Sequence, residues 1–448
     1  MKQLQQFLIL AAGLLAGTVA VASVTKDAVR AEIHGIDVVI VPTGVKDVVT
    51  ITGSLPAGDD RSPADNVALA TVTGEMLDQG TVRHDKFAIA QKLGSVGAAL
   101  SFGVGSNTLQ ISGKSLRPDL PLLVGLLAEQ LREPAFSEAE LAKQKKQLDG
   151  GIRAQLDDPG FRASDAFSRT VFPPGHPNRA APPEKFLADL AQTDVAAIRR
   201  FHSQFYGPTG MRLVIVGDVD PAAAQAEIRK AFKGWTGGSI APPAPRAPEL
   251  SAPRTETIFM PDKASVAVVM GQPTQLQYAD PDSLPLRLGT RILGSGGFTS
   301  RLMANVRDKE GLTYGISAFL TDDTFADGAW SVQADFAPQL LDKGLESTRR
   351  QVESWHADGV TDAELARAKT ELAGTYQVGL ATTSGLAGAI LVMLNRGMPL
   401  SFVDDYPKRI AAMTRDEVNG AIKRHIDPAK LVLVKAGTIE GQGGEKKP

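Results

Sequence analysis

The alternation of apolar and polar residues predicts strands in both halves of the chain. Residues 37–44 (DVVIVPTG), 107–113 (NTLQISG) and 265–273 (SVAVVMGQP) are short apolar or alternating runs bounded by turn residues. Such runs are typical of β-strands with one or both faces buried.

Longer runs with helical spacing lie between these strands. Residues 119–134 place five leucines on one helical face (Leu122, Leu123, Leu126, Leu127 and Leu131). Residues 137–158, 342–359 and 361–376 are predicted helices with one polar face.

The ends of these helices carry capping signals. Ser137 with Glu140 forms a candidate capping box, Thr361 is a candidate N-cap, and Gly359 is placed to end the preceding helix. Thr193 and Thr414 are further candidate N-caps, each in front of a short helix.

The chain divides into two similar halves. A stretch rich in proline and glycine, 236–256, reads as a linker between a domain at 28–235 and a domain at 257–440. Both domains end with a short helix, a proline turn and an apolar strand, which indicates an internal duplication. We therefore expect an α+β fold of two homologous domains, each a mixed or antiparallel sheet with helices packed on one face.

The first 22 residues resemble a secretory signal peptide. Lys2 precedes an apolar stretch from Phe7 to Ala22, which ends in the small residues Ala20-Val21-Ala22. This pattern predicts cleavage after Ala22 and, in a bacterium, export to the periplasm. We expect no membrane contact after cleavage, because no other segment is long and apolar enough to cross a membrane.

Composition and charge restrict the possible chemistry. The net charge of −2 and the lack of a dense basic cluster argue against nucleic acid as a partner. With no cysteine, the chain has no disulfide, thiolate metal site or cysteine nucleophile. No two of the six histidines are three or four residues apart, so no helix presents a two-histidine zinc face. No Gly-x-Ser-x-Gly motif marks a serine nucleophile.

A glycine-rich stretch, LGSGGFTSRL at 293–302, lacks the Gly-Lys-Ser/Thr ending of a phosphate-binding loop. It is interpreted as a turn into a helix at 299–309 capped by Thr299. Gly296 and Gly297 could let an extended peptide backbone approach closely.

Arg307 and Tyr314 follow this stretch. Arg307 falls in the last turn of the predicted helix, which Gly311 closes, and Tyr314 starts the next strand. The two side chains could point into one cleft and donate hydrogen bonds to a peptide carbonyl. The alternative is a purely structural role, in which the arginine complements a helix dipole and the tyrosine packs in a strand.

Several motifs together resemble the pitrilysin/insulinase family of zinc peptidases, the inverzincins, and within it the bacterial two-domain branch. The resemblance covers nearly all of the chain after the signal sequence. It rests on these stretches: GEMLDQGT, LVGLLAEQLREPAFSEAELAKQKKQL, FPPGHPNRAAPP, FYGPTGMRLVIVGDVD, LGSGGFTSRLMANVRDKEGLTYGISA and RAKTELAGTY.

The resemblance implies where the family's zinc site would lie. Its His-x-x-Glu-His motif falls on Thr71, Gly74 and Glu75, and its distal glutamate falls near Gly150. Zinc catalysis needs three protein ligands and a positioned base, so we expect no metal on this chain alone.

The family's arginine and tyrosine, which contact the substrate backbone, match Arg307 and Tyr314 with the same spacing. Arg301 is the nearest rival arginine. The resemblance also implies that the chain is half of a clamshell whose partner is a homologous zinc-binding subunit, with zinc bound by that partner and extended peptides as substrates.

Three further functions stay open on the sequence. The chain could be a structural or assembly protein of the same fold, as some family members are. It could bind peptides alone, without a role in proteolysis. An autonomous metallopeptidase would require stoichiometric zinc in the isolated chain, which we do not expect.

Overall fold

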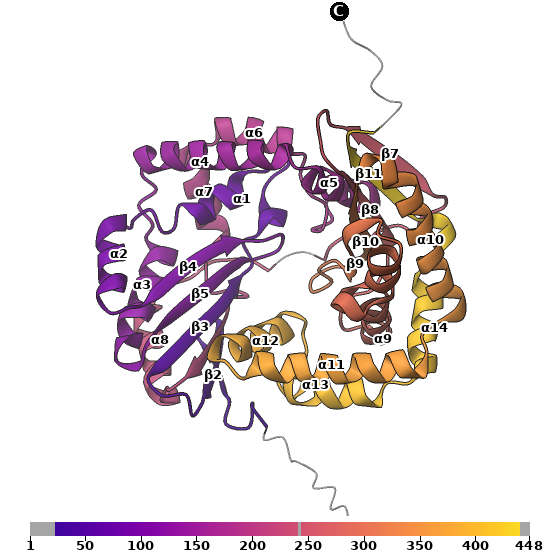
Figure 1. Cartoon of the computed structure of the whole chain (residues 1–448). Coiled ribbons are helices and arrows are strands. Elements are labelled where there is room, and N and C mark those ends of the chain that lie inside the picture. Colours follow the sequence, from indigo (N-terminus) through magenta and orange to yellow (C-terminus); the bar gives the residue numbers. More distant parts are fainter. Residues whose placement is uncertain (1–22, 241–242, 440–448) are drawn as a thin grey trace, which may run out of the picture.

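The computed structural model describes residues 23–240 and 243–439; the predicted signal peptide, residues 1–22, lies outside this part of the chain. The two sheets lie on opposite sides of the molecule (Figure 1). Helices α4, α5 and α6 (residues 138–192) connect them along one edge, and helices α11, α12 and α13 (residues 362–412) connect them along the other. The predicted α+β class with two homologous sheet-and-helix units is therefore confirmed.

The first sheet has six strands in the order β1-β2-β6-β3-β5-β4. Strands β2 and β6 are parallel, and the other neighbours are antiparallel. The strands are β1 Val29–Ile33, β2 Ile36–Pro42, β3 Val48–Leu55, β4 Ala99–Val104, β5 Leu109–Leu116 and β6 Arg212–Gly217.

The second sheet has five strands in the order β7-β11-β8-β10-β9. Strands β7 and β11 are parallel, and the other neighbours are antiparallel. The strands are β7 Arg254–Phe259, β8 Val266–Pro273, β9 Thr313–Leu320, β10 Ala329–Phe336 and β11 Val432–Gly437. Without β1, the first sheet repeats this order and these directions, as the inferred duplication requires.

The helices repeat as well. Helices α4 and α11 both have 19 residues, and the helices that follow them, α5 and α12, both have 13. The first-half helices are α1 Leu69–Glu75, α2 Lys86–Ser95, α3 Leu120–Arg132, α4 Glu138–Leu156, α5 Pro159–Val171, α6 Pro183–Gln192, α7 Val195–Phe205 and α8 Pro221–Ala231. The second-half helices are α9 Ser283–Thr290, α10 Leu341–Asp358, α11 Asp362–Leu380, α12 Thr383–Asn395, α13 Ser401–Ala412 and α14 Arg415–His425.

Each half lends one helix to the sheet of the other half. Helix α5 packs on β8 and β11 of the second sheet, and α12 packs on β3 and β6 of the first (Figure 1). Valines on the first sheet lie in one apolar cluster with α12 (Val39, Val41, Val214 and Val216). This exchange joins the halves through buried apolar surface, which the local sequence pattern does not reveal.

Glycine ends the last strand of each repeat for the same reason. Gly217 and Gly437 have φ values of 145° and 143°. A Cβ atom at either position would lie 2.0 Å from the carbonyl oxygen of Val48 or 2.6 Å from that of Ser265. Both conditions require glycine.

The capping predictions have mixed outcomes. Thr361 and Thr414 form complete capping boxes, and Gly359 ends α10 with φ 73°. Ser137 stands at the N-cap position of α4, but its side chain makes no capping hydrogen bond, and the Glu140 carboxylate pairs with Lys86 and Lys143. Thr193 was also wrong as an N-cap, since the Asp194 side chain caps α7.

No single helix among the described residues is long and apolar enough to cross a membrane. Helices α11 and α12 meet that requirement only as a pair, and they are bent by 112° at their junction.

Candidate functional site

Helix α1 carries Thr71, Gly74 and Glu75, the positions on which the resemblance places the family's zinc motif, and it packs on the edge strand β4. The Thr71 hydroxyl donates a hydrogen bond to the Asp59 carboxylate at 2.8 Å. A Cβ atom on Gly74 would lie 2.3 Å from Cγ2 of Val104 on β4. The position that would carry the general base is therefore closed by packing, besides lacking a carboxylate.

The other two positions of the degenerate site also lack metal-binding geometry. Burial and the neighbouring Asp78 raise the pKa of the half-buried Glu75. Gly150 lies on α4 with open space where its side chain would be. Over residues 23–240 and 243–439, no group of three or more histidine, aspartate and glutamate side chains could hold a metal ion.

An acidic turn that the sequence analysis overlooked lies beside Thr71. Burial raises the pKa of Asp60 to about 6, although Arg61 and Asn107 favour its ionised form. Burial also raises the pKa of Asp59. No spacing signal marks Asp59 and Asp60, because the turn is held by backbone hydrogen bonds to Gly105 and Ser106 and by the Thr71 side chain, which lie elsewhere in the sequence.

The predicted pair Arg307 and Tyr314 is brought together at the edge of the second sheet. The Nε atom of Arg307 donates to the backbone carbonyl of Tyr314 at 2.9 Å, and its Nη1 pairs with Asp308 at 2.7 Å. Gly311, with φ 63°, turns the chain between them. The Tyr314 side chain is 90% exposed, so its hydroxyl faces outward from the edge strand β9.

Phe298 completes this cluster and was missed from the sequence. The Arg307 guanidinium lies 4.8 Å from the centre of the Phe298 ring and 5.6 Å from that of Tyr314. Phe298 is 66% exposed, which is unusual for a large apolar side chain. We call Phe298, Arg307 and Tyr314 the aromatic-arginine cluster.

The glycine-rich turn positions Phe298. Gly297 has φ 64°, and a Cβ atom on Gly296 would lie 2.9 Å from the Arg291 carbonyl oxygen. The predicted helix start at Thr299 was wrong, because Thr299 ends a 3₁₀ turn and its hydroxyl donates to the Gly296 carbonyl at 3.0 Å.

π-helical segments lie on both sides of this turn, at Arg291–Ser295 and Met303–Lys309. π-Helical turns are rare and occur often at functional sites.

Arg301, the rival arginine, has a structural role. Its guanidinium donates to both carboxylate oxygens of Glu364 at 2.7 Å and to the Gly359 carbonyl. Burial opposes ionisation of Glu364, but the hydrogen bonds from Arg301 and Thr361 outweigh it and lower the pKa of Glu364 to about 2. This ion pair fixes the helical segment that carries Arg307 against α11.

Recesses lie beside both edge strands, each under an exchanged helix. One has a volume of about 510 Å³ and lies between α12 and the first sheet, with hydroxyl and amide groups from Ser101, Gln110 and Asn395. The other, of about 350 Å³, lies between α5 and the second sheet and includes Gly315, next to Tyr314.

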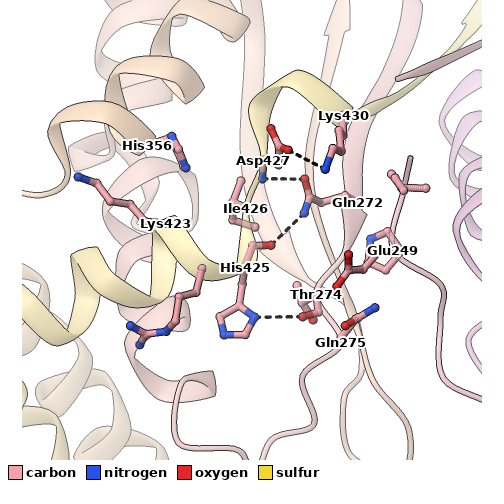
Figure 2. A pocket seen from close by; sticks show the side chains of 13 residues that line it. Glu249, Gln272, Thr274, Gln275, His356, Lys423, His425, Ile426, Asp427 and Lys430 are labelled. Carbon is pink, nitrogen blue, oxygen red and sulfur yellow. Dashed lines mark hydrogen bonds and ion pairs between the residues drawn. The ribbon is translucent and has the colours of Figure 1, made fainter. Parts of the chain in front are cut away.

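A separate polar pocket lies at the end of α14 (Figure 2). Its groups mostly bind one another. The Gln272 amide donates to the His425 carbonyl at 2.9 Å and accepts from the Asp427 backbone nitrogen at 3.0 Å. Lys430 pairs with Asp427 at 3.2 Å. These contacts hold the end of α14 and do not reach the aromatic-arginine cluster.

Comparison of the sequence and the fold with known proteins shows which family the chain resembles. Residues 193–372 match the model of the peptidase M16 inactive domain. This part of the chain therefore resembles a peptidase M16 inactive domain. The resemblance to zinc peptidases that the sequence motifs indicated is confirmed.

Relatives and solved structures resemble the chain beyond the M16 inactive domain. An uncharacterized zinc protease of Streptomyces coelicolor is 28% identical over 81% of this chain and 79% of its own length. A protein of Helicobacter pylori, described as a non-peptidase homolog, is 24% identical over 83% of this chain and 84% of its own.

The structure of a peptidase M16 inactive domain from Pseudomonas fluorescens superimposes with a TM-score of 0.85 at 25% identity. It covers 92% of this chain and 98% of its own. The periplasmic protease PqqL of Escherichia coli matches in fold, with a TM-score of 0.78, over 93% of this chain and 46% of its own.

Proposed function

We propose that this chain is the non-catalytic, substrate-binding subunit of a two-chain zinc peptidase. The observation that carries the proposal is the contrast between a zinc-helix position closed by Val104 and an exposed aromatic-arginine cluster. A homologous partner would supply zinc and the general base.

The cluster has the chemistry for gripping a peptide backbone. A guanidinium and a phenol hydroxyl donate hydrogen bonds to a carbonyl oxygen, and these bonds strengthen when the oxygen gains negative charge during hydrolysis. Phe298 and Tyr314 add flat apolar surface beside those donors. The substrate class that fits is an extended peptide.

The edge strands support the same role. Strands β4 and β9 each end a sheet, so an extended peptide could add to either through main-chain hydrogen bonds. The hydroxyl- and amide-lined recess beside β4 could receive a side chain of that peptide.

Export is part of the proposal. Cleavage after Ala22 would release the chain into the periplasm, where a matching fold is found in the E. coli protease PqqL. Degradation of extended peptides would then take place outside the cytoplasm.

The second candidate is a structural or assembly role without proteolysis. It is favoured by the description of the H. pylori relative as a non-peptidase homolog. Exposure of Phe298 and Tyr314 favours peptide binding instead, because a scaffold would not need these two side chains in solvent.

Co-expression with a homologous chain carrying His-x-x-Glu-His tests the proposal. We expect a stable complex on size exclusion, with one zinc per pair and peptide hydrolysis only when both chains are present. If the partner hydrolyses peptides equally well alone, the proposal is wrong. If no complex forms, the structural role elsewhere is favoured.

A further inference from the structure

The first described residues converge on one carboxylate in the other half of the chain. The Ser23 hydroxyl and the Val24 backbone nitrogen each donate to Asp404 at 2.8 Å. The Thr25 hydroxyl donates to the same carboxylate. Asp404 is in the first turn of α13, about 380 residues further along the chain.

Apolar contacts hold this segment in place. Val24 and Ala28 pack against the same apolar cluster that seats α12 on the first sheet, and Tyr406 of α13 belongs to its rim. The Ala28 nitrogen donates to the Thr25 carbonyl at 3.1 Å, which turns the chain toward β1. The segment 23–28 therefore connects the first sheet to α13.

The predicted processing site is the peptide bond just before these contacts. Hydrolysis between Ala22 and Ser23 consumes one water molecule and leaves a carboxylate on Ala22 and an ammonium group on Ser23. Within a serine, the backbone nitrogen and the side-chain oxygen are only about 3–4 Å apart. The new ammonium group would therefore lie near the carboxylate that the Ser23 hydroxyl already contacts.

We propose that Asp404 is the docking site for the α-ammonium group that forms when the chain is cut after Ala22. The pair would add, only after processing, a charged contact between the mature N-terminus and α13 to the hydrogen bonds that already join them. The Asp404 carboxylate already accepts three hydrogen bonds from residues 23–25. The new ammonium group therefore gains an oppositely charged partner, and no further segment of the chain has to become ordered. The inference rests on the predicted cleavage and not on the role in proteolysis.

Hydrogen exchange of the mature chain tests the proposal. A chain beginning at Ser23 with a free amine is compared with the same chain acetylated at that amine. We expect acetylation to speed exchange of the 25–28 backbone amides about two- to fivefold, the effect of one partly exposed ion pair on local opening. The same acetylation should change nothing in an Asp404→Asn variant.

Asp405→Asn is the matched control, because Asp405 is the next carboxylate on α13 and pairs with Lys408 instead. It should keep the full effect of acetylation. Equal exchange in free and acetylated chains, or an equal acetylation effect in Asp404→Asn, would overturn the proposal. So would N-terminal sequencing of the exported chain that starts at a residue other than Ser23.

Discussion

Helix α1 in the first half and the π-helical segment Met303–Lys309 in the second half are both seven residues long, and each packs on the edge strand of its sheet. Five residues of α1 are buried, whereas only Val306 is buried in the second segment. In the first half Gly74 of α1 packs against Val104 of the edge strand, which leaves no room for a side chain at that position. In the second half Arg307 and Tyr314 remain accessible at the matching edge.

This difference indicates that the two halves of a duplicated fold have been free to diverge at equivalent places. At α1, Gly74 packs against Val104 and leaves no room for a side chain. The second half has a partly exposed arginine beside two exposed aromatic rings. Two properties can be tested separately: that α1 has no room for a side chain at Gly74, and that Arg307 and Tyr314 are accessible to a ligand.

The largest expected effect comes from separating the halves. A chain of residues 23–235 lacks α12, so it would expose the valines that α12 covers on β2 and β6. We expect it to be unfolded or aggregated by circular dichroism and size exclusion. Co-expression with residues 236–448 should restore a folded complex. A stable monomeric 23–235 would show that the helix exchange is dispensable.

Glutamate, which the family carries at the positions matched by Gly74 and Gly150, should destabilise the fold only where there is no room for a side chain. Gly74→Glu forces a side chain into Val104 and should lower the free energy of unfolding by about 2–3 kcal/mol, the typical cost of overpacking. Gly150→Glu is the matched control, because nothing lies within 4 Å of its missing Cβ atom. Urea denaturation measures both. Equal stability of the two variants would mean that α1 is not closed.

Removing the ion pair that supports Arg307 should have a smaller, pH-dependent effect. Glu364→Gln should cost about 1–2 kcal/mol at pH 7, after allowance for partial solvent exposure. Because the folded-state pKa of Glu364 is lowered to about 2, its contribution is present above its ordinary value of 4.5 and is lost as the pH falls toward 2.

Stability measured from pH 7 to pH 2 should therefore show parent and variant converging at the acid end. Glu346→Gln, at an exposed position on α10, is the control and should not change stability. A difference that is independent of pH would contradict the assigned ion pair.

The smallest expected effect is on stability at the cluster itself. Tyr314→Phe removes only a hydroxyl from a side chain that is 90% exposed, so thermal unfolding should change by less than about 0.5 kcal/mol. A larger loss would mean that Tyr314 serves the fold and not a ligand.

Much of the fold followed from local pattern. Leucine spacing in α3, the N-caps at Thr361 and Thr414, and the matching ends of the two halves are all local or repeated signals. The exchange of α5 and α12 could not be predicted, because an apolar helical face does not say which sheet it covers. The predicted capping box of Ser137 and Glu140 is also absent, and the Glu140 carboxylate pairs instead with Lys143 and with Lys86, which is distant in the sequence.

The candidate site was predictable only in part. The spacing of Arg307 and Tyr314 pointed to a pair, and the structure brings them together. Phe298 lies in the glycine-rich stretch, but the sequence did not predict a role for it, because its exposure to solvent is known only from the structure. The raised pKa of Asp60 had no sequence signal either, because its surroundings include residues distant in the sequence, such as Asn107.

The most direct test of the division of labour is peptide turnover by the reconstituted pair with Arg307→Ala, compared with Arg200→Ala at an exposed position on α7. We expect Arg307→Ala to lower kcat/KM about 100- to 1000-fold, the range for losing one donor to a developing oxyanion, while zinc content and complex formation stay unchanged. Arg200→Ala should match the parent pair. Equal turnover in all three pairs would contradict a substrate-binding role for this chain.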